Sequence, residues 1–404
     1  MGFGVWDSGF DSGLGIRDSG FDSTFRARRS SLDNLTHSLF ALTLGRTPLG
    51  RAGRGTTAAL LIASNIPDID IVALAGGGVS YLKWHRGPTH GPLGVFGLGL
   101  VSAGLAWGWQ RYRDRKKEPL LPAEPRAPFA ILVAISMIGV LLHVLMDMPT
   151  SYGTRVLSPF DWHWFAADWL PIIDIYLLAV LAIGLLFGAA STAARRRNAA
   201  IVLVLMAANY GIRAVAHHEA LVVAPRLFGS LLPAACAPST KSGGMLDRWP
   251  RPEQAATAIE SGGRCLVEIA ATPTFLSPFK WRVIARLSNA YEIHEVDLLD
   301  ARGPDAAAPL EHLRRVTLRF PNNWTPRVTQ AAETRLGRVF LGFSRFPSAR
   351  AFTDPTGATT VRWSDMRFAG GIFALDQPVV RPDPFTAVVH IGADGRVDRE
   401  QLGH

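Results

Sequence analysis

The stretch His85-Arg86-Gly87-Pro88-Thr89-His90 places two histidines five positions apart, with a Gly-Pro turn between them, just ahead of a long apolar run. Imidazole nitrogen is the commonest protein ligand of metal ions near neutral pH. Side chains five apart do not share a face of a regular helix, but a bend at Gly87-Pro88 can bring the two rings together. The stretch therefore predicts part of a metal site, with a solvated interfacial loop as the alternative.

Further ionisable residues interrupt the apolar segments on either side of this stretch. Asp68 and Asp70 follow Pro67 in one segment, and His143 and Asp147 lie at i and i+4 near the end of another, which places them on one helix face. Such residues within membrane-length segments are costly and generally have a partner or a function. The candidate metal ligands are His37, Asp68, Asp70, His85, His90, His143 and Asp147.

Mixed imidazole and carboxylate ligands suit a divalent metal ion, with zinc as the first expectation and manganese or iron as alternatives. The candidates outnumber the ligands of one ion, so either two ions bind or some residues orient the ligating histidines. We assign Asp70 or Asp147 as general base and Arg86 as the side chain that binds an anionic group such as phosphate. The alternative is a helix-terminating turn for the Asp pair and a polar pair within one helix for His143 and Asp147.

The composition indicates a membrane protein. Of the 404 residues 48% are hydrophobic and only 19% are charged, which is fewer charged residues than an average soluble protein has. The net charge of +9 is concentrated in short clusters that flank apolar runs. No helix-turn-helix, zinc-finger or basic-aromatic pattern supports nucleic-acid binding.

The apolar runs predict about six membrane segments, since about 20 residues of helix cross the hydrocarbon layer. These runs are Leu35–Leu44, Thr56–Ala75, Gly91–Trp109, Phe129–Met148, Leu170–Ala190 and Ala199–Val223. By the positive-inside rule the basic loops Arg46–Arg54, Arg111–Lys117 and Arg195–Arg197 face the cytoplasm. The candidate ligands then gather on the opposite, outer side, although Arg26, Arg28 and Arg29 argue against this orientation.

An aromatic-rich loop, 149–169, follows His143 and Asp147, and its part 160–169 is expected to lie over the metal site. It carries Asp161, His163 and Asp168, which with Asp174 either join the site or are interfacial residues.

The fold expected is an α-helical multi-spanning membrane domain followed by a small mixed, β-rich soluble domain. The predicted divisions are a disordered N-terminus with an internal repeat (1–30), a membrane domain (33–225), a linker (226–260) and a soluble domain (261–404). The predicted strands are Cys265–Ala271, Lys280–Leu287, Tyr291–Val296, Arg315–Phe320, Val339–Arg345, Thr359–Trp363 and Ala387–Ile391. Cys236 and Cys265 either pair, if they face an oxidising compartment, or are separate small core residues.

These motifs resemble those of the YdjM-like group of bacterial inner-membrane metal-dependent hydrolases, a group described as LexA-binding. The matching pieces lie between about residues 33 and 190: Thr36-His37, Pro67-Asp68-Ile69-Asp70, His85 to His90, His143 with Asp147, and Tyr152-Gly153 followed by Ser158-Pro159-Phe160. The resemblance implies a multi-pass protein of the bacterial inner membrane with hydrolase activity, and it supplies no substrate.

The sequence thus predicts a membrane-bound, metal-dependent hydrolase that acts on a lipid or another amphiphile, with a periplasmic C-terminal domain whose protein partner is unknown. Two alternatives stay open. One is a membrane scaffold without catalysis whose soluble domain binds a partner. The other is a metal or proton transporter, because buried His and Asp residues also mark ion pathways.

Overall fold

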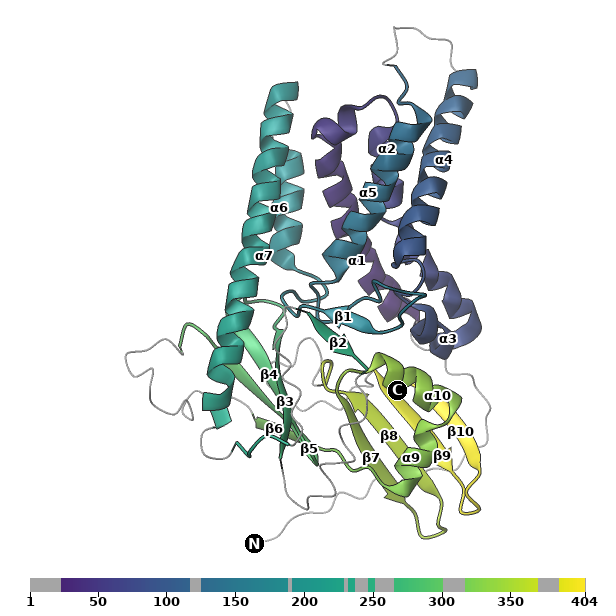
Figure 1. The fold of residues 1–404 in the computed structure, drawn as a ribbon, viewed down its shortest axis with the longest axis vertical. Helices are drawn as coiled ribbons and strands as arrows, with labels where there is room; N and C mark the ends of the chain where they lie inside the picture. The colour runs from purple at the N-terminus through teal and green to yellow at the C-terminus, as the bar shows by residue number, and fades with distance from the viewer. Residues whose placement is uncertain are drawn as a thin grey trace.

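The structure, a computed structural model, describes residues 23–116, 125–187, 191–228, 232–236, 246–250, 265–300, 317–369 and 385–403. A bundle of helices lies at one end of the molecule and two antiparallel sheets lie at the other, as Figure 1 shows. The predicted fold class, helical membrane segments followed by a β-rich region, is confirmed.

Six helices correspond to the six predicted segments, although the first and the fifth are not among those long and apolar enough to cross a membrane. They are α1 (Ser23–Gly45), α2 (Thr56–Ala63), α4 (Pro92–Lys116), α5 (Phe129–Asp147), α6 (Ile175–Leu186) and α7 (Thr192–Phe228). In the described part of the chain, four helical stretches are long and apolar enough to cross a membrane: Thr56–Trp84, Pro92–Lys116, Phe129–Asp147 and Thr192–Phe228. The helix α6 is apolar but shorter.

The stretch Thr56–Trp84 is not one straight helix. Pro67 lies where α2 gives way to the 3₁₀ segment η2 (Ile66–Gly76), which leads directly into α3 (Gly77–Trp84). Proline removes one backbone donor and clashes with the preceding turn, which explains the break. Gly76-Gly77-Gly78 lies at the junction of η2 and α3.

The first helix begins earlier than predicted. α1 starts at Ser23 rather than near Leu35, so Asp33 and Asn34 lie within the helix. No glycine or proline occurs from Ser23 to Leu44, so nothing in the local sequence ends the helix there. Part of the predicted disordered segment 1–30 is therefore helical, and residues 1–22 lie outside the described residues.

The last helix joins the bundle to the first sheet. α7 has 37 residues, about 55 Å at 1.5 Å per residue, and continues beyond the predicted end at Val223. Its C-terminal part packs Leu227 and Phe228 in one core with Trp281 and Val283. The membrane helix and the sheet therefore share a buried interior.

The C-terminal region contains two four-stranded sheets, both entirely antiparallel. The first has the order β3 (Leu266–Pro273), β4 (Lys280–Leu287), β5 (Ala290–Asp297), β6 (Thr317–Pro321). The second has the order β10 (Val397–Leu402), β9 (Thr386–Ile391), β8 (Thr359–Asp365), β7 (Pro347–Thr353). β7 and β10 were not predicted.

One predicted strand, Val339–Arg345, is wrong. Most of it belongs to the helix α10 (Arg335–Phe343), which follows the short helix α9 (Pro326–Ala332). The buried residues Leu336, Phe340 and Phe343 recur at helical spacing, and the Thr334 hydroxyl accepts from the Gly337 N–H as an N-cap. Alternation over a few residues does not distinguish a strand from a short helix, whereas the Thr334 N-cap indicates a helix.

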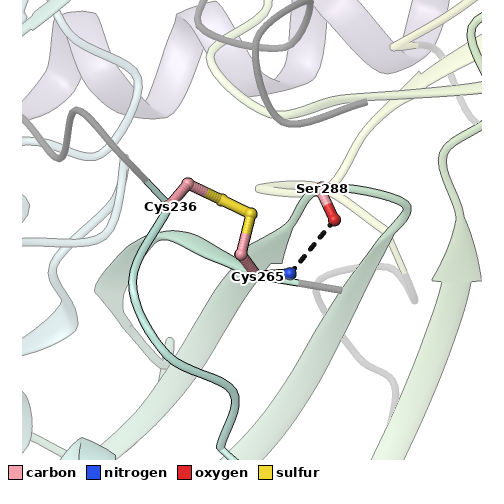
Figure 2. The surroundings of a disulfide bond; sticks show 3 residues. All are labelled: Cys236, Cys265 and Ser288. Atoms are coloured by element: carbon pink, nitrogen blue, oxygen red, sulfur yellow. Dashed lines mark hydrogen bonds between the residues drawn. A yellow bond between two sulfur atoms is a disulfide. The ribbon is translucent and has the colours of Figure 1, made fainter. Parts of the chain in front are cut away.

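The segment 226–260, predicted to be a linker, contributes structure of its own. Its strand β2 (Asp247–Trp249) pairs antiparallel with β1 (Trp164–Ala166) from the aromatic loop. Cys236 and Cys265 form a disulfide beside the start of the first sheet, where the Ser288 hydroxyl accepts from the Cys265 N–H at 3.2 Å (Figure 2). Both features tie this segment to its neighbours.

Candidate metal centre

Four of the predicted ligands meet at one point, although they come from three distant segments of the chain. One donor atom from each of Asp68, His90, His143 and Asp147 lies within 4.8 Å of the other three. η2 supplies Asp68, the turn before α4 supplies His90, and the last turns of α5 supply His143 and Asp147. Apart from Asp68, which is partly exposed, the cluster is buried.

The separations within the cluster fit a four-coordinate ion. The two imidazole Nε2 atoms are 3.2 Å apart. The Nε2 atoms of His90 and His143 lie 3.3 and 3.5 Å from Asp147 Oδ2, and both lie 3.6 Å from Asp68 Oδ1. Four donors at zinc-like bond lengths of about 2.0–2.1 Å around a tetrahedral centre are separated by about 3.3–3.4 Å. The residues present therefore fit a divalent ion such as zinc.

Hydrogen bonds at Nδ1 orient both histidines with Nε2 toward the cluster, and for His143 the bond also fixes the tautomer. His143 Nδ1 lies 2.8 Å from the carbonyl oxygen of Ser64, which can only accept, so Nδ1 carries the proton and Nε2 presents its lone pair to the cluster. His90 Nδ1 lies 2.9 Å from the hydroxyl of Thr89, and its Nε2 likewise faces the cluster. Such outer hydrogen bonds orient ligating histidines.

The cluster attracts positive charge. Burial alone would lower the pKa of His90, but the carboxylates of Asp147 and Asp68, which hydrogen-bond to its ring, raise that pKa to about 9. Two imidazole lone pairs and two carboxylates that face one another repel unless a proton or a metal ion lies among them.

The remaining predicted ligands surround the cluster. His37 on α1 places Nε2 3.3 Å from Asp147 Oδ1 and stacks on His143 with ring centres 4.0 Å apart. Asp70 places Oδ1 3.1 Å from His85 Nδ1 and lies 3.8 Å from His90 Nδ1, behind that ring. Their positions match residues that orient ligands, the second of the two alternatives for a set larger than one ion needs.

Arg86 lies against the cluster with an unusual backbone. Its φ of 50° is left-handed, and its N–H donates to Asp70 Oδ2 at 2.7 Å. Its guanidinium lies 3.3 Å from Asp147 Oδ1 and donates to the Gly153 carbonyl at 3.1 Å. A strained backbone conformation in a buried residue of this kind is typical of functional sites.

The other polar residues near the aromatic loop form ion pairs outside the cluster. These pairs are Asp161 with His163, Asp168 with Arg345, and Asp174 with Arg213. Because Arg345 and Arg213 are far from these carboxylates in the sequence, the sequence alone could not show whether Asp168 and Asp174 belong to the cluster.

A small cavity adjoins the cluster. It is lined by His37 and Asp147 from the cluster side and by Thr36, Thr150 and Tyr210 among its other walls. Apolar residues such as Met146 and Leu177 also line it, and its size and the polar groups beside Asp147 suit a water molecule.

The C-terminal end of α5, which supplies His143 and Asp147, lies at the end of the helical bundle nearest the sheets, and the C-terminal end of α4 lies at the other end (Figure 1). Arg54 pairs with Asp114 near the end of α4 at 2.8 Å, and Arg51 reaches the carbonyl of Thr192 at the start of α7 at 3.5 Å. The basic loops and the candidate ligands therefore lie at opposite ends of the helices.

The fold and the cluster together define a helical membrane protein with a candidate metal centre at one end of its helices. Residues 32–220, just under half of the chain, match the model of the YdjM inner membrane protein family, so the resemblance drawn from the motifs is confirmed for this region. The chain is also similar to the uncharacterized protein YfhP of Bacillus subtilis (strain 168), with 29% identity over 169 residues. That alignment covers 38% of this chain and 46% of the relative, less than half of the length of each. No solved structure matches the chain significantly.

Proposed function

We propose that this protein is a membrane-bound, metal-dependent hydrolase. The observation that carries the proposal is the cluster of Asp68, His90, His143 and Asp147, whose separations of 3.2 to 3.6 Å suit a divalent ion. A divalent ion in such a site supplies a Lewis acid and lowers the pKa of water, which is the chemistry that hydrolysis needs.

The surrounding residues have distinct roles in this proposal. Asp147 accepts a proton from water in the adjoining cavity, because it lines that cavity whereas Asp70, the alternative base, lies behind His90. Arg86 pairs with Asp147, and in this proposal its positive charge also attracts an anionic substrate group. His37 Nε2 contacts the same carboxylate oxygen as Arg86, Asp147 Oδ1.

The substrate in this proposal is a lipid or another amphiphile that arrives from the membrane. Trp84, which directly precedes His85, contacts Trp162 edge to face, and Phe160, which is 76% exposed, lies on the same loop as Trp162. Aromatic side chains of this kind concentrate at the membrane–water interface. The cluster also lies at one end of the helices rather than along them, which favours a hydrolase over an ion pathway.

We place the cluster and the C-terminal region on the periplasmic side of a bacterial inner membrane. Two observations support this orientation. The basic loops gather at the opposite end of the bundle, as the positive-inside rule requires of a cytoplasmic side. The Cys236–Cys265 disulfide lies on the cluster side, and disulfides persist in oxidising compartments.

Elemental analysis of the full-length protein, purified in detergent, tests the proposal. We expect one divalent ion per chain in the native protein and its loss in His90→Ala and in His143→Ala. The control is His390→Ala, a histidine on β9 that hydrogen-bonds to Thr360 far from the cluster and whose loss leaves the metal content unchanged. Full retention of the ion in both cluster variants would overturn the proposal.

A further inference from the structure

Arg367, just after β8 in the C-terminal region, forms hydrogen bonds with the turn 151–153 of the membrane region. Its Nη1 donates to the carbonyls of Ser151 and Tyr152 at 3.1 and 3.0 Å, and its Nη2 donates to the carbonyl of Phe343 at 3.1 Å. Asp365 holds the guanidinium with contacts of 2.7 Å to Nη2 and 3.1 Å to Nε. Both charged side chains are fully buried, so no solvent replaces these bonds.

Arg86 holds the next carbonyl of the same turn from the side of the metal centre. Its Nη1 donates to Gly153 at 3.1 Å, while its Nη2 lies 3.3 Å from Asp147 Oδ1. Two arginines from segments about 280 residues apart therefore bind three consecutive carbonyls, Ser151 to Gly153. One route from Arg367 to the carboxylate of Asp147 therefore passes through this turn and Arg86.

The ring of Tyr152 reinforces the connection. On the side of the cluster it lies under the Arg86 guanidinium, 5.0 Å from the ring centre, and edge to face with His85 at 5.5 Å. On the side of the sheets it packs against Phe343 at 5.4 Å and Phe368 at 6.1 Å. A buried ring that contacts both regions transmits the position of one to the other.

We propose that Arg367 is a positioning residue of the metal centre: by fixing the turn 151–153 it sets the place of Arg86 and hence of Asp147. In this proposal the C-terminal region contributes a residue that positions the metal centre. The step to metal binding rests on the proposed function, whereas the mechanical step from Arg367 to the turn does not.

The test compares Arg367→Met with Arg362→Met in the full-length protein in detergent. Arg362 is an exposed residue of β8, the strand that ends just before Arg367, and so provides a matched control. We expect Arg367→Met to weaken Zn²⁺ binding by about tenfold or more, as changes to outer residues of metal sites do, and Arg362→Met to leave it unchanged. Equal Zn²⁺ affinity in folded Arg367→Met and in the native protein would overturn the proposal. If Arg367→Met does not fold, Arg367→Lys, which keeps the charge but loses the fork of donors, takes its place with the same expectation.

A double-mutant cycle separates positioning from a general loss of stability. Arg86→Gln and Arg367→Met act on one turn, so we expect their effects on Zn²⁺ affinity to be non-additive, whereas Arg86→Gln and Arg362→Met add. Additive effects in the first pair would contradict the proposal.

Hydrogen exchange distinguishes failure of this inference from failure of the proposed function. Backbone amides of 148–156 exchange faster in Arg367→Met than in Arg362→Met if Arg367 holds the turn. If the native protein binds no Zn²⁺, the proposed function fails, and faster exchange still supports the mechanical step. Unchanged exchange rates over 148–156 would overturn that step.

Discussion

His143 Nδ1 lies 2.8 Å from the carbonyl oxygen of Ser64, at the end of α2 and 79 residues away in sequence. Because a carbonyl only accepts, this contact fixes which ring nitrogen carries the proton and directs the other toward Asp68, His90 and Asp147. The Ser64 carbonyl thus orients the His143 ring so that Nε2 can bind a metal ion.

Asp68→Asn is expected to weaken Zn²⁺ binding by at least about tenfold, because it removes one negative ligand while it keeps the size of the side chain. The fold should persist, since Asp68 is the most exposed member of the cluster. Zn²⁺ titration of the purified variant measures the effect. Asp394→Asn, in an exposed turn of the C-terminal region, serves as the control. Equal affinity in the two variants would exclude Asp68 as a ligand.

Arg345→Met is expected to destabilise the protein by about 3–5 kcal/mol, because it leaves two carboxylates without their partner. Burial by itself would lower the pKa of Arg345, but Asp168 and Asp247 raise it, and the contact to Asp247 Oδ2 is 2.5 Å. Thermal or denaturant unfolding measures the change. Arg396→Met, which breaks an exposed pair with Asp394, should have no measurable effect. If both variants unfold alike, the buried network contributes no stability.

Gly153→Ala is expected to cost about 1–3 kcal/mol, because Gly153 has a φ of 81° and a Cβ atom there would lie 2.4 Å from the Trp249 ring. Gly97→Ala is the control. It adds a methyl group where nothing lies within 4 Å and should stabilise the helix by about 0.5–1 kcal/mol. Both changes are measured as the free energy of unfolding of each variant relative to the native protein. Wild-type stability in Gly153→Ala would show that the turn tolerates a side chain.

Replacing both Cys236 and Cys265 by serine is expected to lower stability by about 3–4 kcal/mol, because the disulfide closes a loop with a sequence separation of 29. Unfolding of the double variant under non-reducing conditions measures the loss. In the native protein, thiol alkylation after extraction from membranes should label neither cysteine unless a reductant is added. Labelling without a reductant would place this end of the molecule in a reducing compartment.

Several features of the site could be predicted because they depend on short sequence spacings. The spacing of His143 and Asp147 places them on one helix face, and the proline and glycine positions bend the chain at Asp68 and before His90. The contacts of Ser64, Tyr152 and Arg367 with the site could not be predicted. A backbone carbonyl has no side-chain signature, and no motif links Arg367 to a turn more than 200 residues earlier.

The sequence by itself determined the helical membrane region, the β-rich region and the set of polar residues from which the centre is built. Hydrophobic length, basic clusters and turn residues act over a few positions, so they can be recognised without coordinates. Only the tertiary structure decided that Asp68, His90, His143 and Asp147 form the inner set while Asp70, His85 and Arg86 surround it. Membership of that set depends on separations of a few ångströms between segments far apart in the chain, and these are fixed by how the helices and sheets pack.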